Sequence, residues 1–200
     1  MQVFVGKAAP DFTAKAIMPD NSIESEFNLR RYAKGHKMVL LFYPLDFTFV
    51  CPSEIIALNN RLGEFTERAT KVAVISVDSH FSHLAWKNTS PSKGGVGNIQ
   101  LPMISDINKI ASQSYNVLHE EGISLRGTFI IDEEFIVRHL HVNDLPIGRN
   151  IDEVLRIIDA LDFVEKYGEV CPAGWQKGAE GIDPSHKGIA HYLASNAEKL

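Results

Sequence analysis

Two continuous apolar runs constrain the fold of this chain more than any other feature. One covers residues 38–43 and reads Met-Val-Leu-Leu-Phe-Tyr, and the other covers residues 72–77 and reads Val-Ala-Val-Ile-Ser-Val. Each has the length of a strand, and an unbroken apolar run is typical of a strand buried on both faces. Between them, after Pro52, four apolar residues recur at helical spacing: Ile55, Leu58, Leu62 and Phe65. The sequence therefore predicts a parallel strand–helix–strand unit.

The following segment predicts two short helices and a hairpin. One helix is indicated at residues 81–85, and another follows Asp106, a residue that can cap a helix N-terminus. Residues 128–132 and 135–142 are two segments of strand length that flank Glu133 and Glu134. That spacing predicts an antiparallel hairpin, although the connection lacks the Asn-Gly or Asp-Gly sequence of the commonest turns.

An amphipathic helix and a tail complete the chain. Asn150 and Glu153 form a capping-box-like start, and apolar residues follow at helical spacing: Ile151, Val154, Leu155, Ile158 and Leu161. Gly168 is suited to the C-cap, and beyond it glycines and prolines interrupt any periodicity. We expect a domain over residues 1–167 and an extended tail over residues 168–200 that ends in a short helix. The pattern predicts a three-layer α/β sandwich with a central mixed sheet.

Charge and hydropathy exclude several classes of partner. The chain has 20 Lys and Arg against 25 Asp and Glu, a formal net charge of -5, and nucleic-acid binding normally depends on a basic surface. We therefore expect no nucleic-acid partner. No apolar run approaches the ~18 residues of a membrane span, and the N-terminal residues do not resemble a secretory signal. We accordingly expect a cytoplasmic protein without a membrane partner, whose thiols are kept reduced.

Cofactor and metal motifs are weak in this sequence. The histidines form three close pairs without a neighbouring cysteine or carboxylate cluster: His80 with His83, His139 with His141, and His186 with His191. The segment Gly94-Gly-Val-Gly97 is neither a phosphate-binding loop nor a dinucleotide fingerprint, and no serine-hydrolase motif is present. We expect no bound metal and no cofactor.

Cys51 is one of only two cysteines, and its context indicates chemistry. It follows the first apolar run by a seven-residue link and directly precedes Pro52 and the helical pattern. A helix N-terminus presents unpaired N–H groups and a partial positive charge, which favour a thiolate. We expect the N–H groups of Ser53 and Glu54 to contact the sulfur, and the charge of Glu54 to require a nearby cation. The alternative is that Cys51 is a small buried hydrophobic residue.

Three further residues suit a reactive thiol. Thr48 lies three positions before Cys51, and its hydroxyl can both donate and accept a hydrogen bond, although a threonine taken alone is more often a turn or cap residue. Arg126 precedes an apolar strand, where it can point inward and bind anionic oxygen, although exposed arginines are commoner. Cys171 lies among chain breakers in the tail, a mobile setting in which a second thiol can condense with a sulfenic acid. On the residues alone, an unrelated exposed cysteine remains an equal alternative.

The motifs together resemble the typical 2-Cys peroxiredoxins, which have a thioredoxin-like fold. The resemblance covers nearly the whole chain and rests on several segments in the same order: Ala9-Pro-Asp-Phe12, Pro44-x3-Thr48-x2-Cys51-Pro52, Asp78-Ser-His-Phe-Ser-His-Leu-Ala-Trp86, Leu125-Arg-Gly127, Gly148-Arg149 and Gly168-Glu-Val-Cys-Pro-Ala-Gly-Trp175. It implies a peroxidase in which Cys51 attacks the peroxide. It further implies that Thr48 and Arg126 orient and polarise the peroxide, that Pro44 shields the pocket, and that Cys171 resolves Cys51 of a partner subunit.

The resemblance also implies supporting residues and partners. Glu54 would position arginines, and Arg149 is a further arginine near the site. Gly94-Gly-Val-Gly97 is similar to an element of easily over-oxidised members, whereas Tyr192-Leu193 departs from the Tyr-Phe of those members. The expected partners are a peroxide substrate and thioredoxin or a dedicated flavoprotein reductase. The expected assembly is a homodimer, with five dimers joined into a decamer.

Two other functions compete with peroxide reduction. The tail is also compatible with an interaction protein, either a redox relay or a chaperone-like oligomer in which Cys51 is a sensor. A general disulfide oxidoreductase is less favoured, because the Cys-x-x-Cys pair that such enzymes use is missing.

Overall fold

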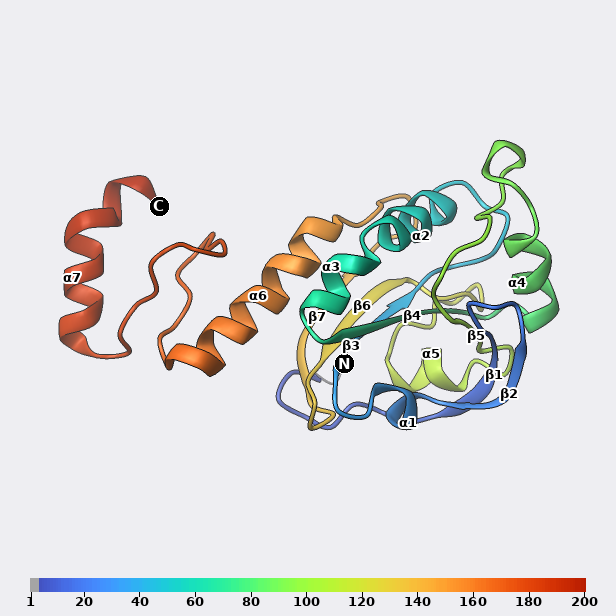
Figure 1. Ribbon diagram of the computed structural model, residues 1–200, viewed down its shortest axis with the longest axis horizontal. Helices are drawn as coiled ribbons and strands as arrows, with labels where there is room; N and C mark the ends of the chain where they lie inside the picture. The colour runs from blue at the N-terminus through green and yellow to red at the C-terminus, as the bar shows by residue number, and fades with distance from the viewer. Residues whose placement is uncertain (1–3) are drawn as a thin grey trace. The chain divides into compact units, whose positions relative to one another are not determined.

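The structure is a computed structural model that describes residues 4–200, and it divides into two compact units (Figure 1). The first unit ends at Arg149 and the second begins at Asn150. By its internal contacts the long helix after Asn150 belongs with the tail. The domain boundary expected between residues 167 and 168 coincides with the end of that helix and stays a prediction.

A mixed sheet, seven-stranded in the described part of the chain, forms the centre of the first unit. Its strands, in sheet order, are β2 (Ile23–Asn28), β1 (Thr13–Ile17), β5 (Met103–Ser105), β4 (Thr70–Ser76), β3 (Lys37–Phe42), β6 (Arg126–Ile131) and β7 (Val137–Asn143). The central strands β3, β4 and β5 run parallel, whereas β1 and β6 run antiparallel to their neighbours. The expected mixed sheet and the expected β6–β7 hairpin are thereby confirmed.

Helices cover both faces of this sheet (Figure 1). On one face lie α1 (Leu29–Ala33) and α5 (Ile110–Ser114), and on the other lie α2 (Cys51–Asn60) and α3 (Leu62–Glu67). Helix α4 (His80–Lys87) packs against β1 and β5, and a short 3-10 turn, η1 (Pro91–Lys93), follows it. These layers form the expected three-layer α/β sandwich.

The core explains why the first apolar run is continuous. All six residues of β3 are buried. Met38, Leu40 and Phe42 point to the face that also buries residues of α1 and α5, while Val39 and Leu41 alternate to the opposite face. The two apolar runs therefore belong to β3 and β4, which are neighbours in the middle of the sheet.

Two local features differ from the sequence expectation. The single helix expected over residues 52–65 is broken at Arg61, whose backbone leaves the helical region (φ -107, ψ 8), so α2 and α3 are separate helices. The apolar residues keep their helical spacing on both sides of Arg61, so the sequence pattern does not indicate this break. Strands β1, β2 and β5 were not expected either. β5 has only three residues, and β2 is largely exposed.

The second unit is a helix with a folded tail. Helix α6 (Ile151–Tyr167) begins where the Asn150 side chain accepts a hydrogen bond from the Asp152 N–H, and it ends at Gly168 in the left-handed region, as expected. The tail carries α7 (His186–Asn196) and a 3-10 turn, η2 (Ala197–Lys199). Across residues 4–200, no helix combines the length and the apolar character that a membrane span requires.

Candidate active site

Cys51 is the first residue of α2 and is fully buried. Pro52 occupies the first turn, where its missing N–H costs no helical hydrogen bond. The N–H groups of Ser53 and Glu54 donate to the carbonyl of Val50 at 3.1 and 3.3 Å. They do not donate to the sulfur, so that part of the sequence expectation is wrong. The helix supplies its dipole to Cys51, and side chains supply the direct contacts.

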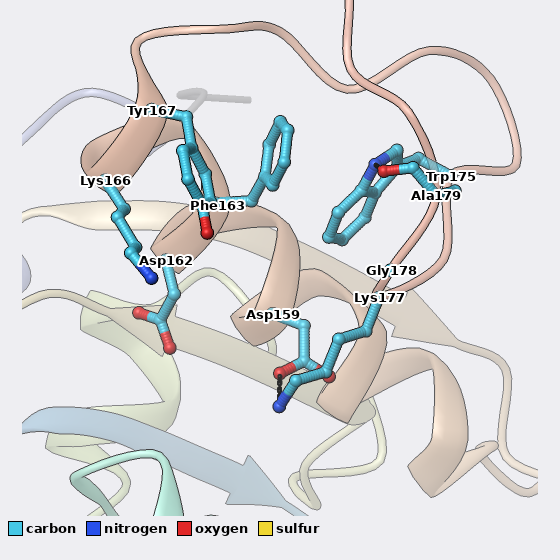
Figure 2. A pocket seen from close by; sticks show the side chains of 9 residues that line it. All are labelled: Asp159, Asp162, Phe163, Lys166, Tyr167, Trp175, Lys177, Gly178 and Ala179. Carbon is cyan, nitrogen blue, oxygen red and sulfur yellow. Dashed lines mark hydrogen bonds and ion pairs between the residues drawn. The ribbon is translucent and has the colours of Figure 1, made fainter.

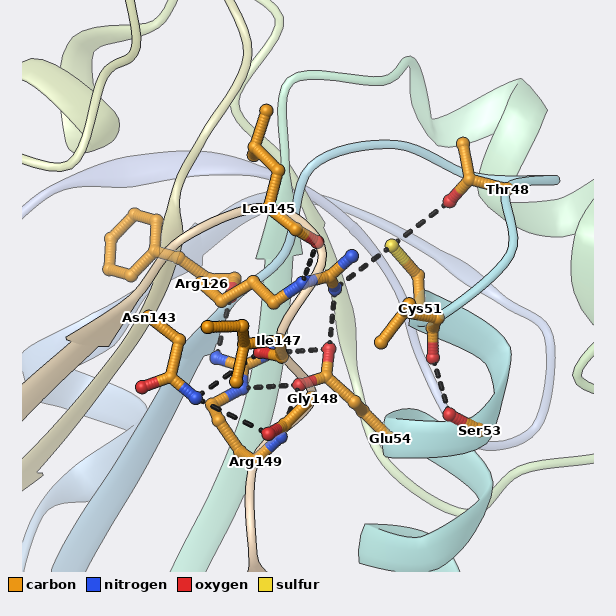
Figure 3. A network of polar contacts seen from close by, with 12 residues as sticks. Thr48, Cys51, Ser53, Glu54, Arg126, Asn143, Leu145, Ile147, Gly148 and Arg149 are labelled. Carbon is orange, nitrogen blue, oxygen red and sulfur yellow. Dashed lines mark hydrogen bonds and ion pairs between the residues drawn. The ribbon is translucent and has the colours of Figure 1, made fainter.

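Thr48 is the nearer of two side chains that contact the sulfur (Figure 3). Its Oγ1 lies 3.0 Å from Cys51 Sγ and 2.8 Å from the carbonyl oxygen of Leu45. The hydroxyl has a single proton, so it can donate a hydrogen bond to only one of these two atoms at a time. With a thiol, the hydroxyl donates to Leu45 and accepts from the S–H. With a thiolate, it can donate to the sulfur.

Arg126 is the second contact and brings a positive charge. It is the first residue of β6, only 4% exposed, with Nη1 3.4 Å from Cys51 Sγ. The same Nη1 lies 2.7 Å from Glu54 Oε2, and Nε donates to the Leu145 carbonyl at 2.7 Å. Nε and Nη1 thus hold the guanidinium beside the sulfur. The sequence left open whether Arg126 points inward or is exposed, and in the structure it points inward.

Glu54 and Arg149 form the buried frame behind this contact (Figure 3). Arg149 Nε and Nη2 lie 2.8 and 2.9 Å from the two carboxylate oxygens, and the backbone N–H of Arg149 also donates to Glu54. The remaining guanidinium nitrogen donates to the carbonyls of Phe42 and Gly127. Burial lowers the pKa of Arg149, and its hydrogen bonds to Glu54 oppose that shift. Glu54 therefore orients both arginines around the end of β3.

The side-chain charges of this site do not balance one another. Two buried arginines face one buried glutamate, which leaves one positive charge uncompensated while Cys51 is neutral. Buried charges are costly unless they are paired. A Cys51 thiolate beside Arg126 completes the balance. Pro44 is buried in the same link between β3 and α2, and its shielding role stays a prediction.

Cys171 has a different setting in the second unit. It is partly buried, and its sulfur lies 3.7 Å from the Ala160 carbonyl of α6. Burial raises the pKa of the Cys171 thiol, while the charge of Arg156 opposes that shift. Arg156 is itself bound to Glu153 and donates to the Trp175 carbonyl at 3.0 Å.

The tail around Cys171 is folded onto α6, whereas the sequence predicted an extended and mobile segment. Phe163 and Trp175 have ring centroids 4.9 Å apart, and Lys177 Nζ lies 3.2 Å from an Asp159 carboxylate oxygen. A cavity of about 390 Å³ lies between helix and tail (Figure 2). Its lining combines aromatic, acidic and basic side chains: Asp159, Asp162, Phe163, Lys166, Tyr167, Trp175, Lys177, Gly178 and Ala179.

The histidine pairs have other settings than a metal site. Among residues 4–200, no three His, Cys, Asp or Glu side chains come together in a way that could hold a metal ion. His83 is fully buried and contacts Asp46 at 2.8 Å, a pairing that the sequence analysis missed. His139 and His141 lie side by side on the edge strand β7, with ring centroids 5.9 Å apart.

Family models and relatives match the chain along its length. The model of the AhpC/TSA family matches residues 5–140, and that of the C-terminal domain of 1-Cys peroxiredoxin matches residues 160–195. Alkyl hydroperoxide reductase C of Helicobacter pylori (strain J99) is 49% identical over 198 residues, which are 99% of this chain and 100% of that protein. Peroxiredoxin-1 of Gallus gallus is 48% identical over 194 residues, 96% of each chain.

A solved structure extends the match to three dimensions. The crystal structure of a reduced 2-Cys peroxiredoxin from Plasmodium vivax has a TM-score of 0.94 and 52% sequence identity, and the match covers 97% of this chain and 100% of that one. This agreement confirms the expected thioredoxin-like fold. The chain belongs to the AhpC/TSA family, and within it to the 2-Cys peroxiredoxins.

Proposed function

We propose that this protein reduces hydrogen peroxide and organic hydroperoxides with Cys51 as the attacking thiolate. Thiol-dependent peroxide reduction follows from its family. The observation that carries the residue assignment is the setting of one sulfur. Cys51 Sγ is buried at a helix start, with Thr48 Oγ1 at 3.0 Å and Arg126 Nη1 at 3.4 Å.

In the first step, the Cys51 thiolate attacks the terminal oxygen of the peroxide. A sulfur–oxygen bond forms, the oxygen–oxygen bond breaks, and the leaving alkoxide or hydroxide takes up a proton. Thr48 and Arg126 stabilise the charge that moves from sulfur to oxygen, as donors fixed before the reaction. Glu54 and Arg149 position the Arg126 guanidinium, and Pro44 limits the access of water. Cys51 ends as a sulfenic acid.

In the second step, a Cys171 thiol condenses with the sulfenic acid. A sulfur–sulfur bond forms and water leaves. We assign this role to Cys171 of the partner subunit, as in typical 2-Cys peroxiredoxins. Both thiols begin the cycle held in place, Cys51 by α2 and Cys171 by α6, so both segments must open locally before the disulfide forms.

Recycling requires an external dithiol. The chain has two cysteines, both used in the disulfide, so thiol exchange with a second protein must restore them. We propose thioredoxin or a dedicated flavoprotein reductase as donor, and a homodimer that joins into a pentamer of dimers as the assembly. Such a cycle needs a compartment that supplies reduced dithiols, which supports a cytoplasmic location.

Two cysteine variants test this function. Wild-type protein should consume peroxide continuously with a dithiol donor and run as a covalent dimer on a non-reducing gel after oxidation. Cys51→Ser should consume none and stay monomeric on that gel. Cys171→Ser should consume one equivalent and then stop. Continued turnover by Cys51→Ser would defeat the proposal, and full cycling by Cys171→Ser would remove its resolving role.

A further inference from the structure

A polar cluster of buried and partly buried side chains contacts the link that carries Thr48. Its members come from the link, from the end of β4 and from α4: Tyr43, Asp46, Ser76, Asp78, Ser82 and His83. The peroxidase mechanism above uses none of these side chains. In the described part of the chain, every buried side-chain nitrogen and oxygen has a hydrogen-bond partner, so the cluster is a fully connected network.

Asp46 is the centre of the cluster and lies two positions before Thr48. Its Oδ1 accepts from the Tyr43 hydroxyl at 2.8 Å, and its Oδ2 accepts from the Ser82 hydroxyl at 2.7 Å. Its backbone N–H donates to Asp78 Oδ2 at 2.8 Å. Both the side chain and the backbone of Asp46 are therefore tied to other elements.

His83 completes the network through a proton whose position can be deduced. Its Nε2 lies 3.1 Å from the Ile104 carbonyl oxygen, which can only accept, so Nε2 carries a hydrogen. Its Nδ1 lies 2.8 Å from Asp46 Oδ2. A contact this short between the nitrogen and the oxygen requires a proton between them, because their lone pairs alone would repel each other. Since His83 is fully buried, the pair connects the link to β5 without competition from water.

The backbone directly after Asp46 is strained. Phe47 has a φ of 54°, in the left-handed region that a bulky residue adopts only when its surroundings enforce it. Its ring lies against that of buried Trp86, with centroids 5.9 Å apart, while about half of the side chain is exposed. Phe47 stands between Asp46 and Thr48, so the conformation that Asp46 anchors is the one that brings Thr48 Oγ1 to the sulfur.

We propose that Asp46 and His83 are positioning residues for peroxide reduction, because they hold the strained link that places the Thr48 hydroxyl against Cys51 Sγ. The inference rests on the proposed function. Asp46 and His83 themselves do not contact the sulfur in the structure. They act through Thr48, and their loss should impair the attack on peroxide while leaving the thiolate and its arginine in place.

Two substitutions of His83 test the inference. Both are made in the Cys171→Ser variant, in which Cys51 is the only thiol that can react. His83→Asn can keep a donor near the position of Nδ1, towards Asp46. His83→Gln can keep a donor near the position of Nε2, towards Ile104, and loses the bond to Asp46. The single-turnover rate with hydrogen peroxide should fall about tenfold in His83→Gln and less in His83→Asn, a magnitude typical of a mispositioned catalytic group. The alkylation rate of Cys51 by iodoacetamide, which needs no Thr48, should stay unchanged in both.

A double variant separates positioning from a general loss of packing. His83→Gln combined with Thr48→Val should react with peroxide no more slowly than Thr48→Val alone, because both changes remove the same contribution. Multiplied losses in the double variant would overturn the inference, as would an alkylation rate that falls together with the peroxide rate.

Ser82→Ala is a milder variant for the case in which His83→Gln does not fold. It removes one hydrogen bond to Asp46 from a partly exposed position and should slow the peroxide reaction about threefold, again only while Thr48 is present. An unchanged rate would count against the inference. Failure of the proposed function would look different, because the Cys171→Ser parent itself would then not react with peroxide.

Discussion

Cys51 and Cys171 have opposite kinds of surroundings in their two units. Cys51 is fully buried and its sulfur contacts two side-chain donors, Thr48 and Arg126. Cys171 is partly exposed, and its sulfur has a long contact with a carbonyl oxygen. A carbonyl oxygen can only accept a hydrogen bond, whereas a hydroxyl and a guanidinium can both donate one to sulfur. The difference matches an attacking sulfur in one unit and a sulfur that waits as a thiol in the other.

The arginines near the two sulfurs sharpen this contrast. Arg126 is buried and points a guanidinium nitrogen at Cys51. Arg156 is bound to Glu153 and to the Trp175 carbonyl, so its donors are occupied by the helix and the tail. Its charge lowers the pKa of Cys171 without a hydrogen bond to the sulfur. One arginine therefore contacts its sulfur directly, while the other binds the loop that carries Cys171.

The largest expected effect is the difference between the two cysteine variants in the rate of the first oxidation by peroxide. Cys51→Ser should abolish the reaction with peroxide, because no other thiol in the chain has a donor-rich, buried setting. Cys171→Ser should leave the rate of the first oxidation within about twofold of wild type, since Cys171 takes no part in that step. Stopped-flow measurement of a single turnover checks both. A slow first oxidation in Cys171→Ser would show that the two sites are coupled before the disulfide forms.

A second prediction concerns the frame behind Cys51. Glu54→Gln leaves two buried arginines without a counter-ion, and breaking a buried ion pair costs about 3–5 kcal/mol of the free energy of unfolding. Glu64 is the matched control, because it pairs with Arg61 at the surface and is 40% exposed. Glu64→Gln should cost at most about 1 kcal/mol. Equal losses in urea-unfolding curves of the two variants would contradict the buried frame.

The site could be predicted from the sequence where its parts lie close together in the chain. Thr48, Cys51 and Pro52 fall within one link and one helix start, so their spacing indicated that they lie close together, and the family resemblance supplied their roles. The sequence left open whether Arg126 points inward, because its contacts with Glu54 and Leu145 join segments far apart in the chain. Such contacts depend on the order of strands in the sheet, which periodicity does not encode.

The fold was predicted to a similar extent and for the same reason. Long apolar runs identified β3 and β4, because burial on two faces leaves an unmistakable pattern. The three residues of β5 carry no such pattern. The sequence did not indicate the Asp46–His83 pair, because the two residues lie 37 positions apart and come together only in the tertiary structure.

The third prediction tests whether the charge of Arg126 acts on the sulfur. Arg126→Gln should slow peroxide reduction about a hundredfold, because a fixed donor to the developing charge is lost. Arg126→Lys should recover part of that loss, since it keeps the charge without the fork geometry. Arg138→Gln is the control on the exposed side of β7, where the arginine pairs with Asp132. A rate for Arg126→Gln equal to that of the control would remove Arg126 from the mechanism.

The smallest expected effect concerns the other cysteine and its dependence on pH. Because burial raises the pKa of Cys171, a smaller fraction of its thiol is ionised at neutral pH than in a free cysteine. Alkylation needs the thiolate, so its rate in Cys51→Ser protein should rise with pH along a curve shifted to higher pH than that of a small-molecule thiol.

Substitution of Arg156 should shift the pH dependence of Cys171 alkylation further. Its charge lowers the pKa of Cys171, so Arg156→Gln should move the alkylation curve still further upward and slow the reaction a few-fold at neutral pH. Arg156→Lys should leave the curve closer to that of the parent, because the charge is kept. Arg156→Gln also removes the bond to the Trp175 carbonyl, and loosening of the tail alone would expose Cys171 and shift the curve downward. The sign of the shift therefore decides whether Arg156 acts on Cys171 mainly through its charge or mainly by holding the loop.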